Sequence, residues 1–194
     1  LVTCLAQEGC RVIVATRDAD KGAEVAEAAT GGPGEAHVIA TDVTDRAAVN
    51  ALVEEVSSRF GAIDVLVNNA GVMFERHVRD MTVAEWDQIL DVNLKAPFLL
   101  TQAVLAPMEE RGSGSIINIG SIEGLAANPG HTAYCATKSG VHGMTRAMAV
   151  DLGASGIRVN AIAPGWIETD LVKEYVSQIA DQESFAQQLR ELHP

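Results

Sequence analysis

The chain has 194 residues, of which 47% are hydrophobic and 21% charged, and its formal net charge is −12. This length is sufficient for one domain with a sizeable core. A net negative charge without any basic run argues against a nucleic-acid partner, because such binding depends on clustered Lys and Arg. No apolar stretch comes close to the length of a membrane span and no signal peptide is visible, so no membrane partner is expected.

The cysteines and histidines predict neither a disulfide framework nor a metal site. Cys4, Cys10 and Cys135 are an odd number without framework spacing, which favours a reducing, cytoplasmic location. The histidines show no paired metal-ligand spacing, so no metal is expected. They are His37, His77, His131, His142 and His193.

Helix and strand patterns alternate from the first residue onward. An apolar, β-branched run follows the first helical pattern and is typical of a strand covered on both faces. The alternation continues without a linker or repeat, so we expect one domain with a parallel sheet and helices on both faces. The first part of the chain predicts a helix over 1–9, a strand over 11–16, a helix over 18–30, a strand over 35–43, a helix over 45–61 and a strand over 63–71.

A long helix is expected over 82–110, because Thr82 and Glu85 match a capping box at its start. Pro97 lies inside this helix and lacks a backbone donor, which predicts a kink near residues 93–96. The sequence beyond the helix predicts a buried strand over 115–120, a helix over 133–154 and a second buried strand before Pro164-Gly165.

Three side chains after the strand at 115–120 can reach one cleft. Ser121 follows the strand, and Tyr134 and Lys138 lie one turn apart on the same helix face. Taken singly, Ser121 could be a turn residue, Tyr134 the edge of a core and Lys138 a solvated cation. Their combination favours a catalytic set. Cys135 has no base partner in the sequence, so we interpret it as a small helix-packing residue rather than a nucleophile.

Several motifs occur in the order typical of one enzyme family. They are NNAG at 68–71, Asn93 in DVNL, Ser121 after INIG, Tyr134-x-x-x-Lys138, Asn160 in RVNAIAPG, and Pro164-Gly165 followed by Thr169. Through them the chain resembles the short-chain dehydrogenase/reductase family over essentially its whole length, and within it the 3-oxoacyl-acyl-carrier-protein reductase and glucose 1-dehydrogenase types. The resemblance implies an α/β fold with a doubly wound, Rossmann-like parallel sheet in three αβα layers, and a single NAD(P)-binding domain over 1–194, incomplete at both ends.

Tyr134 and Lys138 suit the reduction of a carbonyl. Negative charge develops on the carbonyl oxygen as hydride arrives, so a proton donor must lie within hydrogen-bond reach. Tyr134 can donate, and a nearby Lys138 ammonium would bring the phenol pKa down from about 10 towards working pH. Ser121 would orient or stabilise the substrate oxygen. By resemblance, Lys138 also holds the nicotinamide ribose, and Asn93 holds a water that connects Lys138 with solvent. Asn93 could instead simply satisfy the helix kink.

The resemblance places the cofactor at the carboxyl ends of the strands. Asp42 and Val43 resemble the adenine contact, although Asp42 could instead cap the following helix. The further expected contacts, with the adenosine ribose and the nicotinamide, are Asn69, Ala70, Gly71, Pro164, Gly165, Ile167 and Thr169.

The end of the strand at 11–16 bears on the choice of cofactor. NAD-dependent relatives carry an acidic residue there, which binds the ribose 2′-hydroxyl. This chain has Thr16 followed by Arg17. A guanidinium suits a 2′-phosphate, so NADP(H) is favoured. Asp18 follows immediately, so NAD(H) stays an alternative.

Two features of the family are absent from the sequence. A glycine-rich phosphate loop would precede Leu1, and a further helix and strand would follow Pro194, so we expect the interior of a longer protein. The alternative to an oxidoreductase is therefore a non-catalytic scaffold or dimerising fragment that no longer binds cofactor. An epimerase or dehydratase that shares the YxxxK pair is disfavoured by the NNAG and PGWIET motifs.

The loops beside Ser121 and after Pro164 carry the candidate substrate contacts. They are Ile122, Glu123, His131 and Trp166, of which Glu123 and His131 could equally be solvated loop residues. The expected substrate is a small-molecule carbonyl or alcohol. The resemblance also implies a homodimer or homotetramer formed through the helices 82–110 and 133–154.

Overall fold

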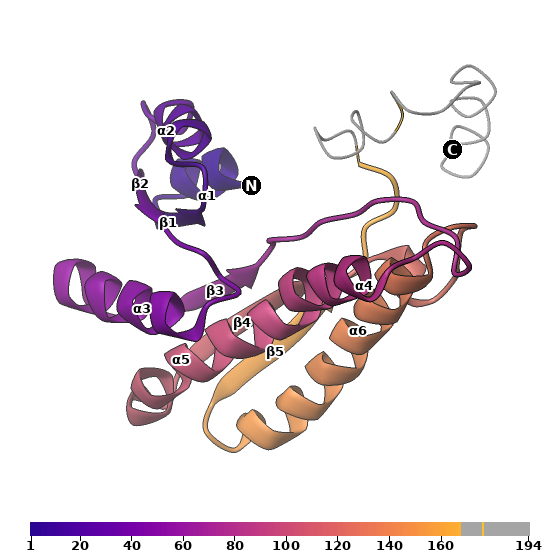
Figure 1. Ribbon diagram of the computed structural model, residues 1–194. Coiled ribbons are helices and arrows are strands. Elements are labelled where there is room, and N and C mark those ends of the chain that lie inside the picture. The colour runs from indigo at the N-terminus through magenta and orange to yellow at the C-terminus, as the bar shows by residue number, and fades with distance from the viewer. Residues whose placement is uncertain (168–175, 177–194) are drawn as a thin grey trace.

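The computed structural model describes residues 1–167 and 176, so the expected contact Thr169 lies outside the described residues. Every strand in this part of the chain runs parallel to its neighbours, and together they form two sheets (Figure 1). The first sheet pairs β1 (Arg11–Thr16) with β2 (Glu35–Ala40). The second has the order β3 (Val65–Asn68), β4 (Gly114–Ile119), β5 (Ile157–Ile162).

A division into two sheets differs from the single sheet that the sequence predicts. No hydrogen-bonded ladder joins β1 to β3 among the described residues. In the doubly wound order 3-2-1-4-5-6, one strand lies between those that correspond to β1 and β3. Since no described strand occupies that place, the ladder is interrupted there. The parallel direction, the strand order on either side and the crossover helices agree with the predicted fold class.

The helices follow the predicted alternation with small shifts at their ends. Asp18 and Asp45 begin two of them, because each carboxylate accepts a hydrogen bond from a first-turn amide, Lys21 N at 3.0 Å and Ala47 N at 2.9 Å. The helices of the first half are α1 (Val2–Gln7), α2 (Ala19–Glu27) and α3 (Arg46–Phe60). Those of the second half are α4 (Val83–Leu90), η1 (Asp91–Lys95), α5 (Ala96–Arg111), η2 (Ile122–Gly124) and α6 (Thr132–Gly153).

Strand alternation places helices on both sheet faces. Ile13, Ala15 and Ile39 pack against the α3 and α5 side chains. The next residues in register point the other way: a Cβ at Gly22 of α2 would lie 2.7 Å from a methyl carbon of Val38. Because successive strand residues face opposite sides, α2 lies across the sheet from α3 and α5. The three-layer αβα arrangement follows.

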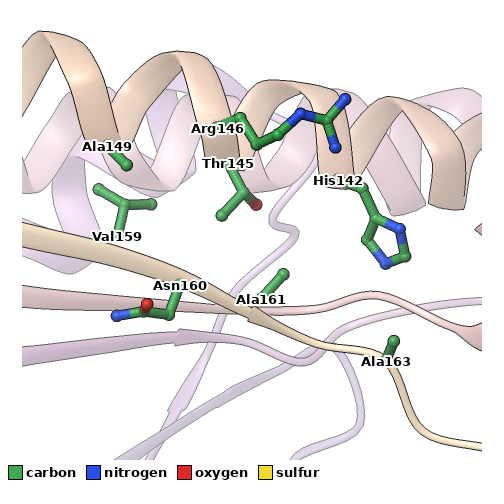
Figure 2. Close-up of a pocket in the computed structure, with 8 residues that line it drawn as sticks. All are labelled: His142, Thr145, Arg146, Ala149, Val159, Asn160, Ala161 and Ala163. Atoms are coloured by element: carbon green, nitrogen blue, oxygen red, sulfur yellow. The ribbon is translucent and has the colours of Figure 1, made fainter.

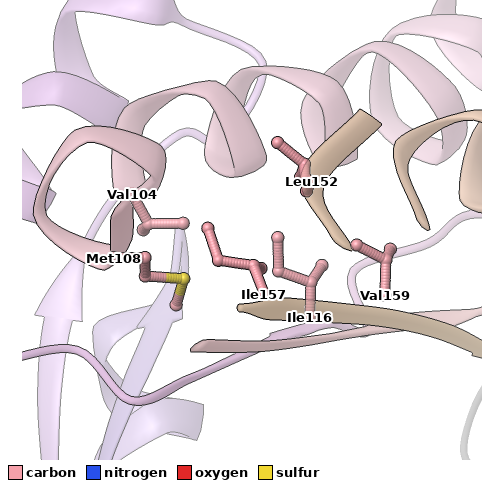
Figure 3. Packing of buried hydrophobic residues seen from close by; sticks show 6 residues of the cluster. All are labelled: Val104, Met108, Ile116, Leu152, Ile157 and Val159. Carbon is pink, nitrogen blue, oxygen red and sulfur yellow. The ribbon is translucent and has the colours of Figure 1, made fainter. Parts of the chain in front are cut away.

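The larger core joins β4 and β5 to α5 and α6. Six buried apolar side chains form it: Val104, Met108, Ile116, Leu152, Ile157 and Val159 (Figure 3). Ile116, at 0% exposure, lies at its centre on the middle strand of the sheet. A second cluster packs α3 on α5 through Val49, Leu52, Val56, Leu99 and Leu100.

The predicted kink is a π-helical turn. A continuous run of helix carries α4 into η1 at Asp91–Lys95 and then into α5, with Pro97 in the first turn of α5. Pro97 has no N–H to donate, and the wider turn ahead of it accommodates the missing bond. The capping box also forms, since Thr82 Oγ1 accepts from Glu85 N and the Glu85 carboxylate accepts from Thr82 N.

By length and composition the helical run Val83–Arg111 could span a membrane, since an 18-residue stretch of it has a mean hydropathy of 1.3, so the expectation that no stretch approaches that length was wrong. In the structure its apolar side chains Leu99, Leu100 and Val104 are buried in the two core clusters. Burial of this helical run against a sheet explains its apolar composition, because a core helix needs apolar residues on most of its surface.

Candidate active site

The loop after β4 is held beside the end of β5 by two backbone bonds. Gly120 N donates to Ile162 O at 2.7 Å, and Ile122 N donates to Pro164 O at 3.0 Å. Ser121 lies between these anchors, buried at 8% exposure. Its Oγ accepts from Glu123 N at 3.1 Å, so Ser121 is the N-cap of η2 and its side chain is fixed. Ser121 is therefore a turn residue, as one alternative predicted, and this position is compatible with the catalytic role that the other alternative predicted.

Tyr134 and Lys138 lie on one face of α6, as their spacing predicts. The Lys138 Nζ lies 5.5 Å from the centroid of the Tyr134 ring. It also donates to Ile119 O at 2.8 Å, which ties α6 to the carboxyl end of β4. Lys138 is only 5% exposed, so it is not a solvated cation, and burial lowers its pKa to about 8.

The pKa of Tyr134 moves in the direction opposite to the one expected. Burial raises the phenol pKa above its usual value, and the nearby Glu123 carboxylate adds to the rise. Hydrogen bonding with the Ser121 hydroxyl acts the other way without outweighing burial. The Lys138 ammonium lies over the ring and is bonded to Ile119 O, so it is not directed at the phenol oxygen. In this arrangement burial favours the protonated form of the Tyr134 phenol.

Asn93 lies within the π-turn η1 and is buried at 1% exposure. Its side chain clamps the loop after β3: Oδ1 accepts from Val72 N and Nδ2 donates to Val72 O, each at 2.8 Å. It therefore does more than satisfy the turn in its own helix. A Cβ on Gly71 would lie 3.5 Å from Asn93 Oδ1 and 3.9 Å from Lys138 Nζ, so these two side chains face the same small space.

A ladder of buried amides and hydroxyls supports the site and was missed from the sequence. Asn68 Nδ2 donates to Asn118 Oδ1 at 2.8 Å, and Asn118 Nδ2 donates to Thr145 Oγ1 at 2.9 Å. The ladder joins β3, β4 and α6 through residues that are at most 6% exposed. The signal was an asparagine in each of two largely apolar strands, VLVN and SIINI, since buried amides require partners.

Glu123 and His131 are buried together, so the reading of them as solvated loop residues was wrong. Glu123 is 5% and His131 1% exposed. The Glu123 carboxylate lies 2.7 Å from His131 Nδ1, and Asn128 Nδ2 donates to its other oxygen at 2.9 Å. Of the other two candidate substrate contacts, Ile122 and Trp166 are half-buried.

On the other sheet, Thr16 is the last residue of β1 and Arg17 follows it, exposed. One oxygen of the Asp18 carboxylate caps α2 by accepting from Lys21 N. Asp42 accepts from Thr44 N at 2.9 Å and from Thr44 Oγ1 at 2.7 Å, and these bonds lower its pKa. Asp45 caps α3, so the idea that Asp42 is the cap was wrong.

The remaining expected contacts occupy strand ends. Val43 packs its side chain against the α3–α5 cluster. Asn69, Ala70 and Gly71 are exposed after β3. After β5, Pro164 and Gly165 are half-buried, and Ile167 is 56% exposed.

Comparison with known proteins identifies the family. The model of the family described as short chain dehydrogenase matches residues 1–180. The chain belongs to the short-chain dehydrogenase/reductase family. It is an oxidoreductase of this family, whose members are NAD(P)-dependent and act on carbonyl and CH–OH groups.

Two curated relatives illustrate the match. The 3-oxoacyl-[acyl-carrier-protein] reductase FabG of Thermotoga maritima is 41% identical over 169 residues, which cover 87% of this chain and 69% of that protein. A 3-alpha-(or 20-beta)-hydroxysteroid dehydrogenase of Mycobacterium bovis is 42% identical over 186 residues, 92% of this chain and 69% of the relative.

A solved structure agrees with the fold. A crystal structure of a short-chain dehydrogenase/reductase from Burkholderia xenovorans superposes with a TM-score of 0.94 at 32% identity, covering 98% of this chain and 73% of the other. The parallel sheet predicted from the alternation, and the doubly wound, Rossmann-like fold class that the resemblance implied, are thereby confirmed.

The donor set of this short-chain dehydrogenase/reductase fits part of a nicotinamide dinucleotide. Lys138 Nζ has three N–H donors, and the bond to Ile119 O uses one of them. Gly71, exposed beside Asn93 and Lys138, leaves the space at the end of β3 free of a side chain. Lys138 and the open space beside Gly71 therefore fit the nicotinamide-ribose side of such a cofactor.

A cavity of about 360 Å³ lies between α6 and β5 (Figure 2). His142 and Thr145 connect it to the site: a Cβ on Gly120 would meet His142 Nε2, and Thr145 Oγ1 accepts from Asn118 Nδ2 at 2.9 Å. The lining residues are His142, Thr145, Arg146, Ala149, Val159, Asn160, Ala161 and Ala163. Among the residues that the structure describes, none of the predicted catalytic or cofactor-binding residues lines this cavity.

Proposed function

We propose that this chain transfers a hydride between NADP(H) and a carbonyl or secondary alcohol, with Tyr134 as proton donor and acceptor. One observation carries the proposal: the Ser121 hydroxyl and the buried Lys138 ammonium both contact Tyr134, from a loop and from the next helical turn. A surface tyrosine would not need a buried lysine beside it, because burying an ammonium is costly.

Each side chain then has a distinct task. When bound, the nicotinamide supplies or accepts the hydride. Tyr134 donates its phenolic proton to the oxygen that gains charge in the reduction, and takes a proton back in the oxidation. Ser121, fixed as the cap of η2, hydrogen-bonds the same oxygen and stabilises the charge that develops there.

Lys138 would bind the ribose hydroxyls through the donors that Ile119 O does not use. A pKa of about 8 leaves it mostly charged at neutral pH, and contact with the oxyanion of Tyr134 would favour the ammonium further. Asn93 holds the loop that carries Gly71 and stands beside the ammonium, which supports a role in connecting Lys138 with solvent.

The preference for NADP(H) over NAD(H) rests on Arg17. Its guanidinium is exposed after β1, whereas the neighbouring Asp18 carboxylate is engaged as a helix cap. A carboxylate that caps a helix competes poorly as an acceptor for a ribose hydroxyl, and the guanidinium suits a 2′-phosphate. Asp42 and Val43 would then line the adenine.

The wider setting is part of the same proposal. Residues 1–194 form a single NAD(P)-binding domain of a cytoplasmic enzyme that acts on a small molecule. We propose a homodimer or homotetramer built on the α4–α5 run and α6. Phe98 on α5 and Val150 on α6, 42% and 81% exposed, support contacts there because large apolar side chains are rarely left in water without a function.

The direct test is turnover by the expressed chain with NADPH or NADH and a panel of 3-oxoacyl thioesters, steroid ketones and simple ketones. The 3-oxoacyl thioesters and steroid ketones are chosen because the matched relatives are named for them. NADPH-dependent reduction of any ketone supports the proposal. Absence of both turnover and NADPH binding contradicts it and favours the non-catalytic scaffold.

The coenzyme preference has its own prediction. Arg17→Ala should weaken NADPH binding about tenfold and leave NADH binding within about twofold, because only the phosphate contact is lost. Isothermal titration with each coenzyme measures this. Arg59→Ala, an exposed arginine on α3 paired with Glu55, is the matched control. Equal losses for the two coenzymes would remove Arg17 as the 2′-phosphate contact.

A further inference from the structure

His142 extends the helix face that carries Tyr134 and Lys138. The three residues follow one another at intervals of four along α6, so their side chains lie on one face in successive turns. His142 is 8% exposed, and Figure 2 shows its ring reaching from α6 towards the end of β5. A buried imidazole therefore lies one turn beyond the two residues proposed for catalysis.

The ring of His142 fills the space that two glycine side chains would need. A Cβ on Gly120 would lie 2.2 Å from Nε2 and 2.7 Å from Cδ2 of the ring. A Cβ on Gly124 would lie 2.7 Å from Cε1 and 2.9 Å from Nδ1. Side chains do not pack this closely, so the ring lies directly against the backbone at both glycines. Ser121 lies between them, in a segment that we name the serine loop (residues 120–124).

Hydrogen bonds from α6 hold the serine loop at its two ends. Lys138 Nζ donates to Ile119 O at 2.8 Å, immediately before the loop, and Ser139 Oγ donates to Gly124 O at 3.0 Å. Between these two bonds the loop packs on the ring of His142. The ring therefore sets how closely the middle of the loop, with its serine, approaches the helix.

The ring of His142 is held by its shape and not by a hydrogen bond from its outer nitrogen. Among the described residues, His142 Nε2 has no hydrogen-bond partner. Burial lowers the pKa of His142, and the charges of Arg146 and Lys138 lower it further, so the ring is mostly uncharged at neutral pH. A buried polar atom without a partner costs free energy, which the packing of the ring must offset. An apolar side chain of similar volume should therefore replace the ring.

We propose that His142 is a positioning residue for Ser121, whose ring holds the serine loop where the Ser121 hydroxyl meets the Tyr134 phenol. His142 acts through Ser121 and not on the substrate. The hydrogen bond between Ser121 and Tyr134 requires a fixed separation of loop and helix. Displacing a catalytic group by about 1 Å can lower a rate about a hundredfold. This inference rests on the proposed function, in which both hydroxyls act on one substrate oxygen.

Turnover of two variants tests the role of the ring. His142→Ala removes the ring and should lower kcat by about tenfold to a hundredfold, while the Kd for NADPH stays within about threefold. His142→Leu restores most of the volume and should keep kcat within about threefold of the parent. The control His37→Ala removes a ring packed on Phe60 beside the other sheet and should keep kcat. An Ala variant within threefold of the parent, or a Leu variant as slow as Ala, overturns the proposal.

A double variant separates positioning from a general loss of stability. If His142 acts through Ser121, then adding His142→Ala to Ser121→Ala should lower kcat by no more than about twofold, because the hydroxyl to be positioned is already absent. If His142 stabilises the site as a whole, the losses of the two single variants should multiply. Multiplied losses overturn the proposal.

Amide hydrogen exchange tests the packing without turnover. The amides of Gly120 and Ile122 donate to backbone oxygens at and just after the end of β5. In His142→Ala these two amides should exchange about tenfold faster than in the parent. The Val72 amide, bonded in the loop after β3, should exchange at the parent rate. Unchanged exchange at both amides of the serine loop overturns the proposal.

The exchange measurement also lets the two proposals fail separately. If the parent reduces no ketone, the proposed function fails, and faster exchange in His142→Ala still supports the role of the ring in placing Ser121. If circular dichroism shows that His142→Ala does not fold, His142→Val takes its place in every comparison, with the same criteria. Valine lacks the four ring atoms that meet the glycines.

Discussion

The two sheets of the molecule differ in how deeply they are buried. In β4 four of the six positions are buried, and Ile116 and Asn118 are both 0% exposed. In β1 and β2 no position is fully buried. The residues proposed for proton transfer lie beside the buried sheet that contains β4. The residues proposed to select the coenzyme lie beside the less buried sheet of β1 and β2. Proton transfer needs fixed geometry, whereas a coenzyme contact can form as the ligand binds.

The packing of the two sheets accounts for this difference. β4 has strands on both sides and the α5 and α6 helices on one face. β1 has one partner strand, and a two-stranded sheet is marginally stable unless other elements cover it. The 22-residue helix α6 spans the better-packed sheet and carries Tyr134 and Lys138. Most of the free energy of folding should therefore come from this half of the molecule.

Substituting one isoleucine in each sheet should show the largest difference in the free energy of unfolding. Ile116→Ala in β4 should lower the free energy of unfolding by about 4 kcal/mol, because it leaves a cavity in a closed core. Ile13→Ala in β1 should lower it by about 1 to 2 kcal/mol, since Ile13 is only partly buried. Urea unfolding measures both. Equal losses would show that the two sheets contribute alike.

A glycine pair tests the loop that carries Ser121. A Cβ on Gly120 would lie 2.2 Å from His142 Nε2 and 3.1 Å from Ile162 O, so Gly120→Ala should cost about 2 to 3 kcal/mol through overpacking. At Gly153, near the end of α6, a Cβ meets nothing within 4 Å. Gly153→Ala should therefore be neutral or stabilise by about 0.5 kcal/mol. A harmless Gly120→Ala would mean that the loop can move away from His142.

Lys138 should show the smallest effect and one that depends on pH. Its pKa is about 8 when folded and 10.5 unfolded, so the buried ammonium opposes folding below about pH 8. Between these values the folded state loses the proton first, and the free energy of unfolding rises with pH. Lys138→Met should lack this rise and be about 1 to 2 kcal/mol more stable near pH 7, the lost bond to Ile119 O offsetting part of the gain.

Urea titrations near pH 7 and pH 10 measure this difference. The control is Lys95→Met, whose exposed ammonium pairs with Asp91 and should leave the slope with pH unchanged. A Lys138→Met chain that is less stable than the parent near neutral pH would contradict the cost assigned to the buried ammonium.

The sequence predicted the parts of the molecule that local patterns control. The strand at 11–16, the capping box at Thr82 and the distortion ahead of Pro97 each depend on a few neighbouring residues, and each was located correctly. The shared helix face of Tyr134 and Lys138 follows from helical spacing alone. The fold class follows from the alternation, because parallel strands joined by helices have few arrangements.

What the sequence did not predict depends on contacts between distant elements. The direction of the Tyr134 pKa depends on burial and on Glu123, eleven positions away, and no local pattern reports either. The ladder from Asn68 to Thr145 joins residues far apart in the chain. The division of the strands into two sheets reflects which strands find hydrogen-bond partners, which propensity does not encode.

The central claim is that Tyr134 transfers the proton, and Tyr134→Phe tests it most directly. Turnover with NADPH and the best ketone should fall by about a thousandfold, while the Kd for NADPH stays within about threefold, because the phenyl ring keeps its packing and only the proton is lost. Asp151→Asn, an exposed residue near the end of α6, is the control and should keep full turnover. Turnover of Tyr134→Phe within tenfold of the parent would contradict the account.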